Sequence, residues 1–108
     1  MTGPDAEDAK LVTLARSARA RTKAAQGAAV RDTDGRTYVA TTVTLPSLSL
    51  SALQVAVCMA VSSGALGLEA AVILGDDTED PGGTQALRDI APSATLIVAG
   101  PTGAIAPN

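Results

Sequence analysis

The apolar run Ala70-Ala71-Val72-Ile73-Leu74 limits the chain to a small set of folds. Successive side chains of a strand point to opposite faces of its sheet, so a strand with one face in water alternates apolar and polar residues. This run does not alternate, and we therefore expect a central strand over Leu68–Leu74. A strand buried on both faces needs helices on both sides of the sheet, which indicates an α/β fold. With 108 residues the chain is long enough for one domain, residues 1–108.

Two elements are expected before this strand. A helix is predicted over Asp5–Lys23, with acidic residues near its start, basic residues near its end and a narrow apolar stripe at spacings of three and four. Its basic side chains are interpreted as a solvated face. The β-prone segments Ala28–Val30 and Thr37–Thr44 flank Asp34-Gly35, a pair that favours a tight turn, and so predict a β-hairpin.

A second helix is expected to begin after Leu45-Pro46-Ser47, which breaks the strand before it. Ser47 or Ser49 can cap this helix, and Gly64 can end it after about Ser63. The helix is almost uncharged, so we expect it to be buried on most sides. Cys58, between Val57 and Met59, is accordingly interpreted as a small buried apolar side chain.

The last third of the chain predicts an acidic loop over residues 75–83, a short helix over Thr84–Ile90 and a strand over Thr95–Ala99. Residues 101–108 are small and rich in proline and glycine, and predict a flexible tail beyond a core of about residues 5–100. The element order is α-β-β-α-β-α-β. It predicts a mixed sheet of four or five strands with helices on both faces.

Composition excludes several classes of function. The chain has no histidine and a single cysteine, which excludes a histidine-containing triad, an internal disulfide and a zinc site of several thiolates. A net charge of −3 and an almost complete lack of aromatic residues argue against a nucleic-acid partner. No apolar run is long enough to cross a membrane, and the N-terminus is polar and acidic, so we expect a cytoplasmic protein without a membrane partner.

Four stretches of the chain, taken in order and spacing, are similar to segments of the small cytidine deaminases. They are Ala15-Arg16-Ser17-Ala18-Arg19; Gly27-Ala28-Ala29-Val30 with Asp34-Gly35-Arg36-Thr37-Tyr38; Ala60-Val61-Ser62-Ser63-Gly64; and Gln85-Ala86-Leu87-Arg88-Asp89-Ile90-Ala91-Pro92. They resemble that family's first helix, its first strand and hairpin, the end of its second helix, and its third helix. The resemblance covers about residues 11–99 and implies the family's three-layer sandwich and a homodimer or homotetramer.

The catalytic positions implied by the resemblance carry other residues here. The family holds zinc through Cys-Ala-Glu and Pro-Cys-x-x-Cys, with the glutamate moving protons. The first motif aligns with Ser51-Ala52-Leu53, and the two thiolates of the second align with Asp80 and Gly83. A catalytic zinc needs about three protein ligands, which a hydroxyl, one carboxylate and a glycine do not supply, and Leu53 cannot transfer a proton. We therefore expect no catalytic residue and no zinc or other cofactor, with Ser51, Leu53, Asp80 and Gly83 in capping, packing and turn roles.

Three further segments offer polar groups to a ligand. The segment that supplies the family's ribose-binding residues reads Thr42-Val43-Thr44, which leaves Thr42 and Thr44 as a vestigial ligand pocket. The acidic residues of the loop at 76–80 offer oxygen ligands to a hard cation, but a solvated loop is the preferred interpretation. Pro81-Gly82-Gly83-Thr84 offers backbone N–H groups to an anion, which the neighbouring carboxylates would repel.

The sequence thus predicts a catalytically inactive cytidine deaminase homologue that acts as an interaction or structural protein. A core poor in aromatic residues buries little area per residue, and association would help it stay folded, so we expect a homo-oligomer with an unidentified protein partner. One alternative is a degenerate nucleoside-binding regulator. The second alternative, from the family resemblance alone, is an active cytidine deaminase.

Overall fold

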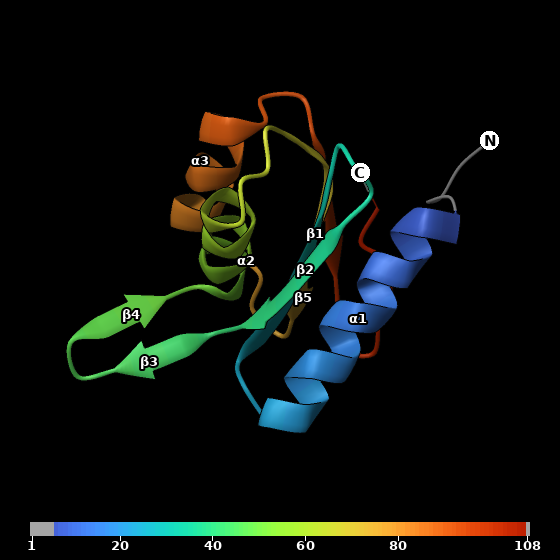
Figure 1. The fold of residues 1–108 in the computed structure, drawn as a ribbon. Coiled ribbons are helices and arrows are strands. Elements are labelled where there is room, and N and C mark those ends of the chain that lie inside the picture. The colour runs from blue at the N-terminus through green and yellow to red at the C-terminus, as the bar shows by residue number, and fades with distance from the viewer. Residues whose placement is uncertain (1–5, 108) are drawn as a thin grey trace.

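The computed structural model describes residues 6–107 of the chain and has the predicted α/β class (Figure 1). Its elements in chain order are α1 (Ala6–Thr22), β1 (Gln26–Asp32), β2 (Thr37–Thr41), β3 (Val43–Leu45), β4 (Leu48–Leu50), α2 (Ala52–Ser62), β5 (Leu68–Gly75), α3 (Pro81–Ile90) and β6 (Thr95–Ala99). The first helix, the first hairpin and the last two strands lie close to where the sequence predicts them. Asp5 falls outside the described residues, and β2 ends at Thr41 rather than at Thr44.

The main sheet has four strands in the order β2-β1-β5-β6. β1 pairs antiparallel with both β2 and β5, whereas β5 and β6 run parallel, so the sheet is mixed as predicted. β5 is central, and every residue from Leu68 to Gly75 except Glu69 is buried. The apolar run of β5 is unbroken because both faces of this strand are covered, as the sequence predicts.

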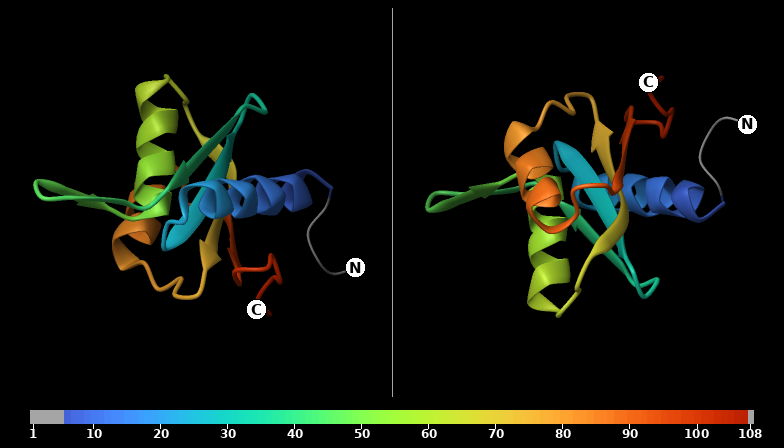
Figure 2. Two further views of the ribbon diagram at one scale, coloured as in Figure 1. Left: turned by 90° about the horizontal axis from the view of Figure 1, so that it is seen from below. Right: turned by 90° about the horizontal axis from the view of Figure 1, so that it is seen from above.

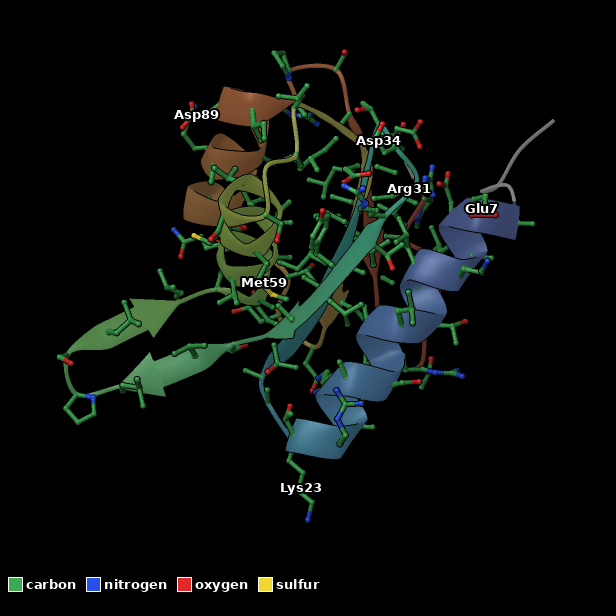
Figure 3. All side chains as sticks on the ribbon, viewed as in Figure 1. Glu7, Lys23, Arg31, Asp34, Met59 and Asp89 are labelled. Carbon is green, nitrogen blue, oxygen red and sulfur yellow. The ribbon has the colours of Figure 1, made fainter. Side chains whose placement is uncertain are left out.

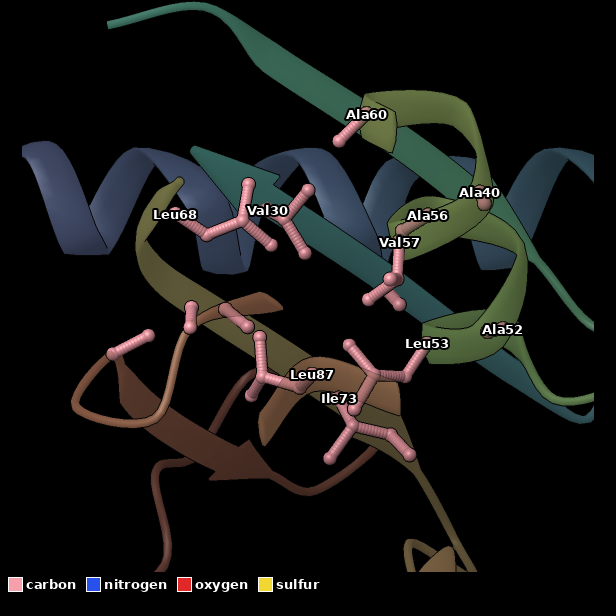
Figure 4. Close-up of a cluster of buried hydrophobic side chains, with 14 residues drawn as sticks. Val30, Ala40, Ala52, Leu53, Ala56, Val57, Ala60, Leu68, Ile73 and Leu87 are labelled. Carbon is pink, nitrogen blue, oxygen red and sulfur yellow. The ribbon is translucent and has the colours of Figure 1, made fainter. Parts of the chain in front are cut away.

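Helices cover both faces of this sheet and make three layers (Figure 2). α1 lies on one face, where its buried side chains pack on β1, β5 and β6 in a cluster of Leu11, Val12, Ala15, Ala29, Ala70, Val72, Leu74, Ile97 and Ala99. α2 and α3 lie on the other face. The larger cluster there includes Val30, Leu53, Val57, Ile73 and Leu87 (Figure 4). Alternate residues of β1 and β5 enter opposite clusters, so the two strands join the layers.

The prediction for residues 43–50 is wrong. Leu45-Pro46-Ser47 does not lead into a helix but belongs to a second hairpin, in which β3 and β4 form a separate two-stranded sheet. This hairpin projects away from the three layers (Figures 1 and 2). Neither Ser47 nor Ser49 caps α2, which begins at Ala52 behind Ser51. Leu48-Ser49-Leu50 fits a strand as well as a helix, and its pairing with Val43–Leu45 decides between them.

The start predicted for α3 and the burial predicted for Cys58 are also wrong. α3 begins at Pro81 rather than Thr84, because Asp80 caps it and proline is well accommodated in the first turn of a helix, although Gly82 and Gly83 are poor helix formers. Cys58 is exposed rather than buried. α2 buries one face, with Leu53, Ala56 and Ala60, and leaves Met59 and Val61 exposed despite its lack of charge.

The tail predicted to be flexible folds back along β6. The N–H of Ala106 donates to the carbonyl of Val98 at 2.8 Å, and Ile105 forms a bridge with Ala99. Arg16 of α1 donates to the carbonyl of Thr102 at 3.0 Å. Residues 102–106 are thereby connected to both the sheet and the first helix.

Candidate functional site

A cleft of about 400 Å³ opens where the beginning of β1, the end of β4, the first residue before α2 and the loop after β5 meet. Most of its lining residues have polar or charged side chains, and they come from segments far apart in the sequence. The lining residues are Arg19, Ala25, Gln26, Thr42, Ser49, Leu50, Ser51, Asp76, Asp77, Glu79 and Asp80. The cleft therefore joins the first half of the chain to the acidic loop.

Gln26 holds these segments together. Its backbone N–H donates to Thr42 Oγ1 at 2.9 Å, and its carbonyl accepts from the N–H of Thr42 at 3.2 Å. Its side-chain amide donates to the carbonyl of Asp77 at 3.0 Å and accepts from the N–H of Ala52 at 3.3 Å. One residue at the start of β1 thus fixes the end of β2, the acidic loop and the first turn of α2.

The N-terminus of α2 faces the cleft, and acceptors of the chain itself bind the N–H groups of Ala52 and Gln54. Ser51 Oγ accepts from the N–H of Gln54 at 3.1 Å, and Gln54 Oε1 accepts from the N–H of Ser51 at 3.0 Å. These two bonds form a capping box. With Ala52 bonded to Gln26, the end of the helix is closed by neutral side chains, and the hydroxyl of Ser51 has a structural partner.

The N-terminus of α3 is closed in a similar way by Asp80. Its Oδ1 accepts from the N–H of Gly83 at 3.0 Å. Its Oδ2 is buried, with no hydrogen-bond partner among residues 6–107. A Cβ atom added at Gly83 would overlap Asp80 Oδ2, and would lie 2.7 Å from Asp80 Cγ and 3.0 Å from Leu53 Cβ. The Asp80 carboxylate thus occupies the space that a side chain at position 83 would need.

Charge in the cleft is predominantly negative. Arg19 pairs with Asp76 at 3.3 Å and also donates to the carbonyl of Ala25 at 3.1 Å. Asp77 Oδ1 accepts from the N–H of Glu79 at 3.1 Å within the loop. Within the part of the chain that the structure describes, no group of three histidine, cysteine or carboxylate side chains could hold a metal ion. The negative balance disfavours an anionic ligand.

The structure brings most of the predicted site residues together. Thr42, Ser51 and Asp80 line the cleft, and Leu53 and Gly83 are buried beside it. Thr44 does not line it, because it lies in β3 of the projecting hairpin and is exposed. Sequence reasoning missed Gln26. No local pattern marks it, since its bonds join residues 16 to 51 positions away.

The structure does not fit a zinc site of the implied kind. Ser51 and Asp80 use their oxygens to cap helices, Gly83 has no side chain, and Leu53 is 0% exposed within the core. Three protein ligands with an open fourth position are therefore not supplied by these four residues.

The chain is thus an α/β/α sandwich in which the N-termini of α2 and α3 meet at a cleft. The chain belongs to the cytidine deaminase-like family, whose sequence profile matches residues 4–103. Crystal structures of cytidine deaminases are similar in fold. That from Burkholderia pseudomallei has a TM-score of 0.79 at 19% identity, covering 90% of this chain and 87% of its own.

Two mycobacterial cytidine deaminases give the same result. The enzyme from Mycobacterium tuberculosis has a TM-score of 0.72 at 24% identity, with 94% of this chain and 89% of its own covered. The enzyme from Mycobacterium leprae has a TM-score of 0.70 at 23% identity, with 94% and 93% covered. No curated protein sequence matches the chain significantly. No helix within residues 6–107 is both long and apolar enough to span a membrane.

Proposed function

We propose that this chain is a catalytically inactive cytidine deaminase homologue that acts as a self-associating interaction or structural protein. The observation that carries the proposal is the position of Leu53. In the motif alignment it stands in place of the glutamate that moves protons in the family, and it is fully buried. A leucine side chain has no titratable group, so it supplies neither a general acid nor a general base.

The neighbours of Leu53 support this proposal. It belongs to the cluster with Val57, Ile73 and Leu87, where an ionised side chain would be costly to bury without a partner (Figure 4). The space beside it at Gly83 is taken by the Asp80 carboxylate. The region in which the family carries out its chemistry is therefore packed as core and as helix caps.

A second candidate function, a degenerate nucleoside-binding regulator, is favoured by the cleft itself. About 400 Å³ is open beside the hydroxyl of Ser51 and the Thr42–Gln26 hydrogen bonds. Hydroxyl and amide groups suit the sugar of a neutral nucleoside, whereas the carboxylates disfavour a phosphorylated one. The cytoplasmic location and the lack of a nucleic-acid partner stay predictions from composition.

The test is zinc content per chain by elemental analysis, run beside an ammonia-release assay on cytidine and deoxycytidine. The Mycobacterium tuberculosis enzyme, prepared in the same way, is the positive control. We expect substoichiometric zinc and no turnover. Stoichiometric zinc with turnover would overturn the proposal and establish the deaminase activity instead.

The nucleoside-binding candidate is tested by thermal unfolding with and without cytidine. A ligand that binds only the folded state raises the melting temperature with concentration. The substitution Glu79→Gln in the cleft should change that rise, whereas Asp34→Asn in the distant β1–β2 turn should not. A melting temperature unaffected by millimolar cytidine contradicts this second candidate.

A further inference from the structure

The outer edge of β2 carries unpaired backbone groups. β2 is the last strand of the main sheet and pairs with β1 alone among the described strands. At one end of this pair the N–H of Thr42 donates to the carbonyl of Gln26 at 3.2 Å, and at the other end the N–H of Asp32 donates to Arg36 at 2.8 Å. Hydrogen-bonded and non-hydrogen-bonded pairs alternate along an antiparallel ladder, so some residues of β2 turn their N–H and C=O groups away from β1. These residues are Thr37, Val39 and Thr41.

This edge lacks the features that protect exposed strand edges. A proline, a charged side chain, a β-bulge or a covering segment hinders an edge strand from pairing with another chain. β2 reads Thr-Tyr-Val-Ala-Thr, without charge or proline, and its register with β1 is unbroken. Within residues 6–107 no other segment bonds to its outward groups, whereas β6 at the opposite edge is bonded to Ala106. In Figure 1 β2 lies in front of the sheet, between α2 and α1.

Leu14 flanks this edge on the α1 side. Arg16 reaches Thr102 in the segment after β6, so that flank of α1 faces β6. Successive helix residues are about 100° apart, which puts Leu14 about 160° from Arg16 and on the flank that faces β2. Leu14 is 36% exposed. Arg21, two turns further along the same flank, is also exposed, and its guanidinium has no ion pair among the described residues.

Met59 flanks the edge on the α2 side. Gln54 lies on the flank of α2 that faces α3, because a Cβ atom added at Gly82 would lie 2.8 Å from its Nε2. Met59 follows five residues later, about 140° around the helix, on the flank toward β2. It is 40% exposed, and Figure 3 shows it on this side of α2. The open edge therefore has an exposed apolar side chain on each side.

We propose that the edge of β2 binds an extended segment of a partner protein, which joins the main sheet as a further strand. The backbone of that segment bonds to the outward N–H and C=O groups of β2, and its side chains point alternately toward α1 and α2. Those on one side contact Leu14 and those on the other contact Met59, so the segment is apolar on both faces. The proposal rests on the interaction role in the proposed function and names its surface.

The charge beside the edge selects the partner. α1 ends shortly before Gly27, which pairs with Thr41, so Arg21 lies toward the Thr41 end of β2. A carboxylate on the α1-facing side of the bound segment pairs with Arg21 there, whereas α2 brings no charge to the other side. The β2 strand of a second copy has no carboxylate and would leave Arg21 unpaired. An apolar segment of another protein with one acidic residue therefore fits this edge better than a second copy does.

Amide hydrogen exchange of the free chain, followed by NMR, tests whether the edge is open. The amides of Thr37, Val39 and Thr41 should exchange at least about tenfold faster than those of Tyr38 and Ala40, which face β1. Equal protection of the five amides would show that a second copy or another segment already covers the edge, and would overturn the proposal.

The peptide acetyl-Thr-Val-Val-Val-Thr-Glu-amide is the probe for binding. It carries valine on both faces of an extended strand and a carboxylate on one of them. At millimolar peptide we expect chemical-shift changes and slower exchange at the amides of Thr37, Val39 and Thr41. Changes confined to other parts of the chain, or no change at all, would contradict the proposal.

Val39→Pro and Val39→Ala separate the backbone contact from side-chain packing. Both remove the valine side chain, which packs on the α1 side of the sheet, but only proline lacks the N–H. Proline is tolerated in an edge strand where the N–H would face solvent, and circular dichroism checks that both variants fold. We expect the dissociation constant of the peptide to be at least about tenfold larger for Val39→Pro than for Val39→Ala. Equal constants would rule out a bond to this N–H.

Arg21→Gln tests the charge contact without any change to the strand. It should weaken binding of the peptide by about threefold at low salt, and leave unchanged the binding of a peptide with glutamine in place of glutamate. Arg16→Gln, which removes one positive charge from the opposite flank of α1, is the matched control. Equal weakening by the two substitutions would overturn the contact with Arg21 and with it the acidic partner.

These results are read separately from the test of the proposed function. A peptide that does not bind to a chain without zinc or turnover overturns the edge of β2 as the docking surface and leaves the loss of catalysis standing. Stoichiometric zinc with turnover overturns the proposed function, whatever the peptide does.

Discussion

The Asp32 carboxylate is buried in the turn between β1 and β2. Burial favours the neutral form and by itself raises the pKa of this group, but hydrogen bonds from the N–H of Arg36, the hydroxyl of Tyr38 and the N–H of Asp34 stabilise the ionised form. Together with the charge of Arg36 they hold the pKa of Asp32 below its ordinary value. The hydrogen bond to Asp32 in turn raises the pKa of Tyr38.

This pKa shift predicts a dependence of stability on pH. A carboxyl group with a lowered pKa in the folded state stabilises the fold above its ordinary pKa, and that contribution is lost as the pH falls through the folded value. For Asp32 the loss lies below pH 3.8. Urea unfolding between pH 6 and pH 2.5 should show a smaller acid loss for Asp32→Asn than for wild type, with Tyr38→Phe between them. Parallel curves for wild type and Asp32→Asn would contradict this account.

The close packing around Gly83 predicts that a side chain at this position destabilises the fold. Gly83→Ala places a methyl group in the space of the Asp80 carboxylate and against Leu53, so we expect a loss of about 1–3 kcal/mol in the free energy of unfolding. The matched control is Gly82→Ala in the same helical turn. There the added atom meets only the end of the flexible Gln54 side chain, at 2.8 Å from Nε2. Urea denaturation compares the two, and equal losses would refute the packing argument.

Among the elements, α1 and β1 approach each other closely at Gly27. A Cβ atom there would overlap the backbone oxygen of Ala15, and would lie 3.0 Å from the carbonyl carbon of Ala15 and 3.1 Å from Arg19 Cβ. Backbone atoms of a helix cannot yield as a side-chain end can. The absence of a side chain at Gly27 therefore sets the distance between the helix and the sheet.

Gly27→Ala is accordingly expected to destabilise the protein by about 3 kcal/mol, at the upper end of the usual range for overpacking. Gly67→Ala is the comparison, because the added atom lies 3.4 Å from a methyl carbon of Thr33, an ordinary contact. The melting temperatures of both variants by differential scanning calorimetry test this. A Gly27→Ala protein as stable as Gly67→Ala would show that α1 can shift away from β1.

Local sequence signals mark the starts of α2 and α3. Ser51 with Gln54 three residues later is a capping-box pattern, and Pro81 after Asp80 is a favoured helix start, so both boundaries are encoded locally. The predicted boundaries differ because Ser47 and Ser49 compete as caps, and because two glycines after Pro81 favour a loop. The pairing of β3 with β4 removes the first ambiguity.

For the whole molecule, the segment after β6 covers an edge of the main sheet. β6 is an edge strand, and exposed strand edges can pair with other chains. The N–H of Ala106 donates to Val98 and the Ala99–Ile105 bridge lies beside it. Ile105 and Ala106 thus occupy backbone groups of β6.

Ala106→Pro removes that N–H and should expose part of the edge of β6. We expect faster amide hydrogen exchange in residues 95–99 and more light scattering on prolonged incubation than for wild type. Ala106→Ser keeps the N–H and serves as the control. If exchange in residues 95–99 is the same in both variants, the tail does not protect this strand.

The sequence by itself determined the α/β class, the buried central strand, the first hairpin and the family resemblance, because each follows from patterns within a few residues of one another. It also placed Ser51, Leu53, Asp80 and Gly83 in one region through the motif alignment. Only the tertiary structure decided that Gln26 joins the walls of the cleft, that Thr44 lies outside it and that Cys58 is exposed. The position of Gln26 and that of Thr44 depend on contacts between segments far apart in the chain. The exposure of Cys58 depends on which face of an uncharged helix the sheet covers. The periodicity of apolar residues specifies neither of these.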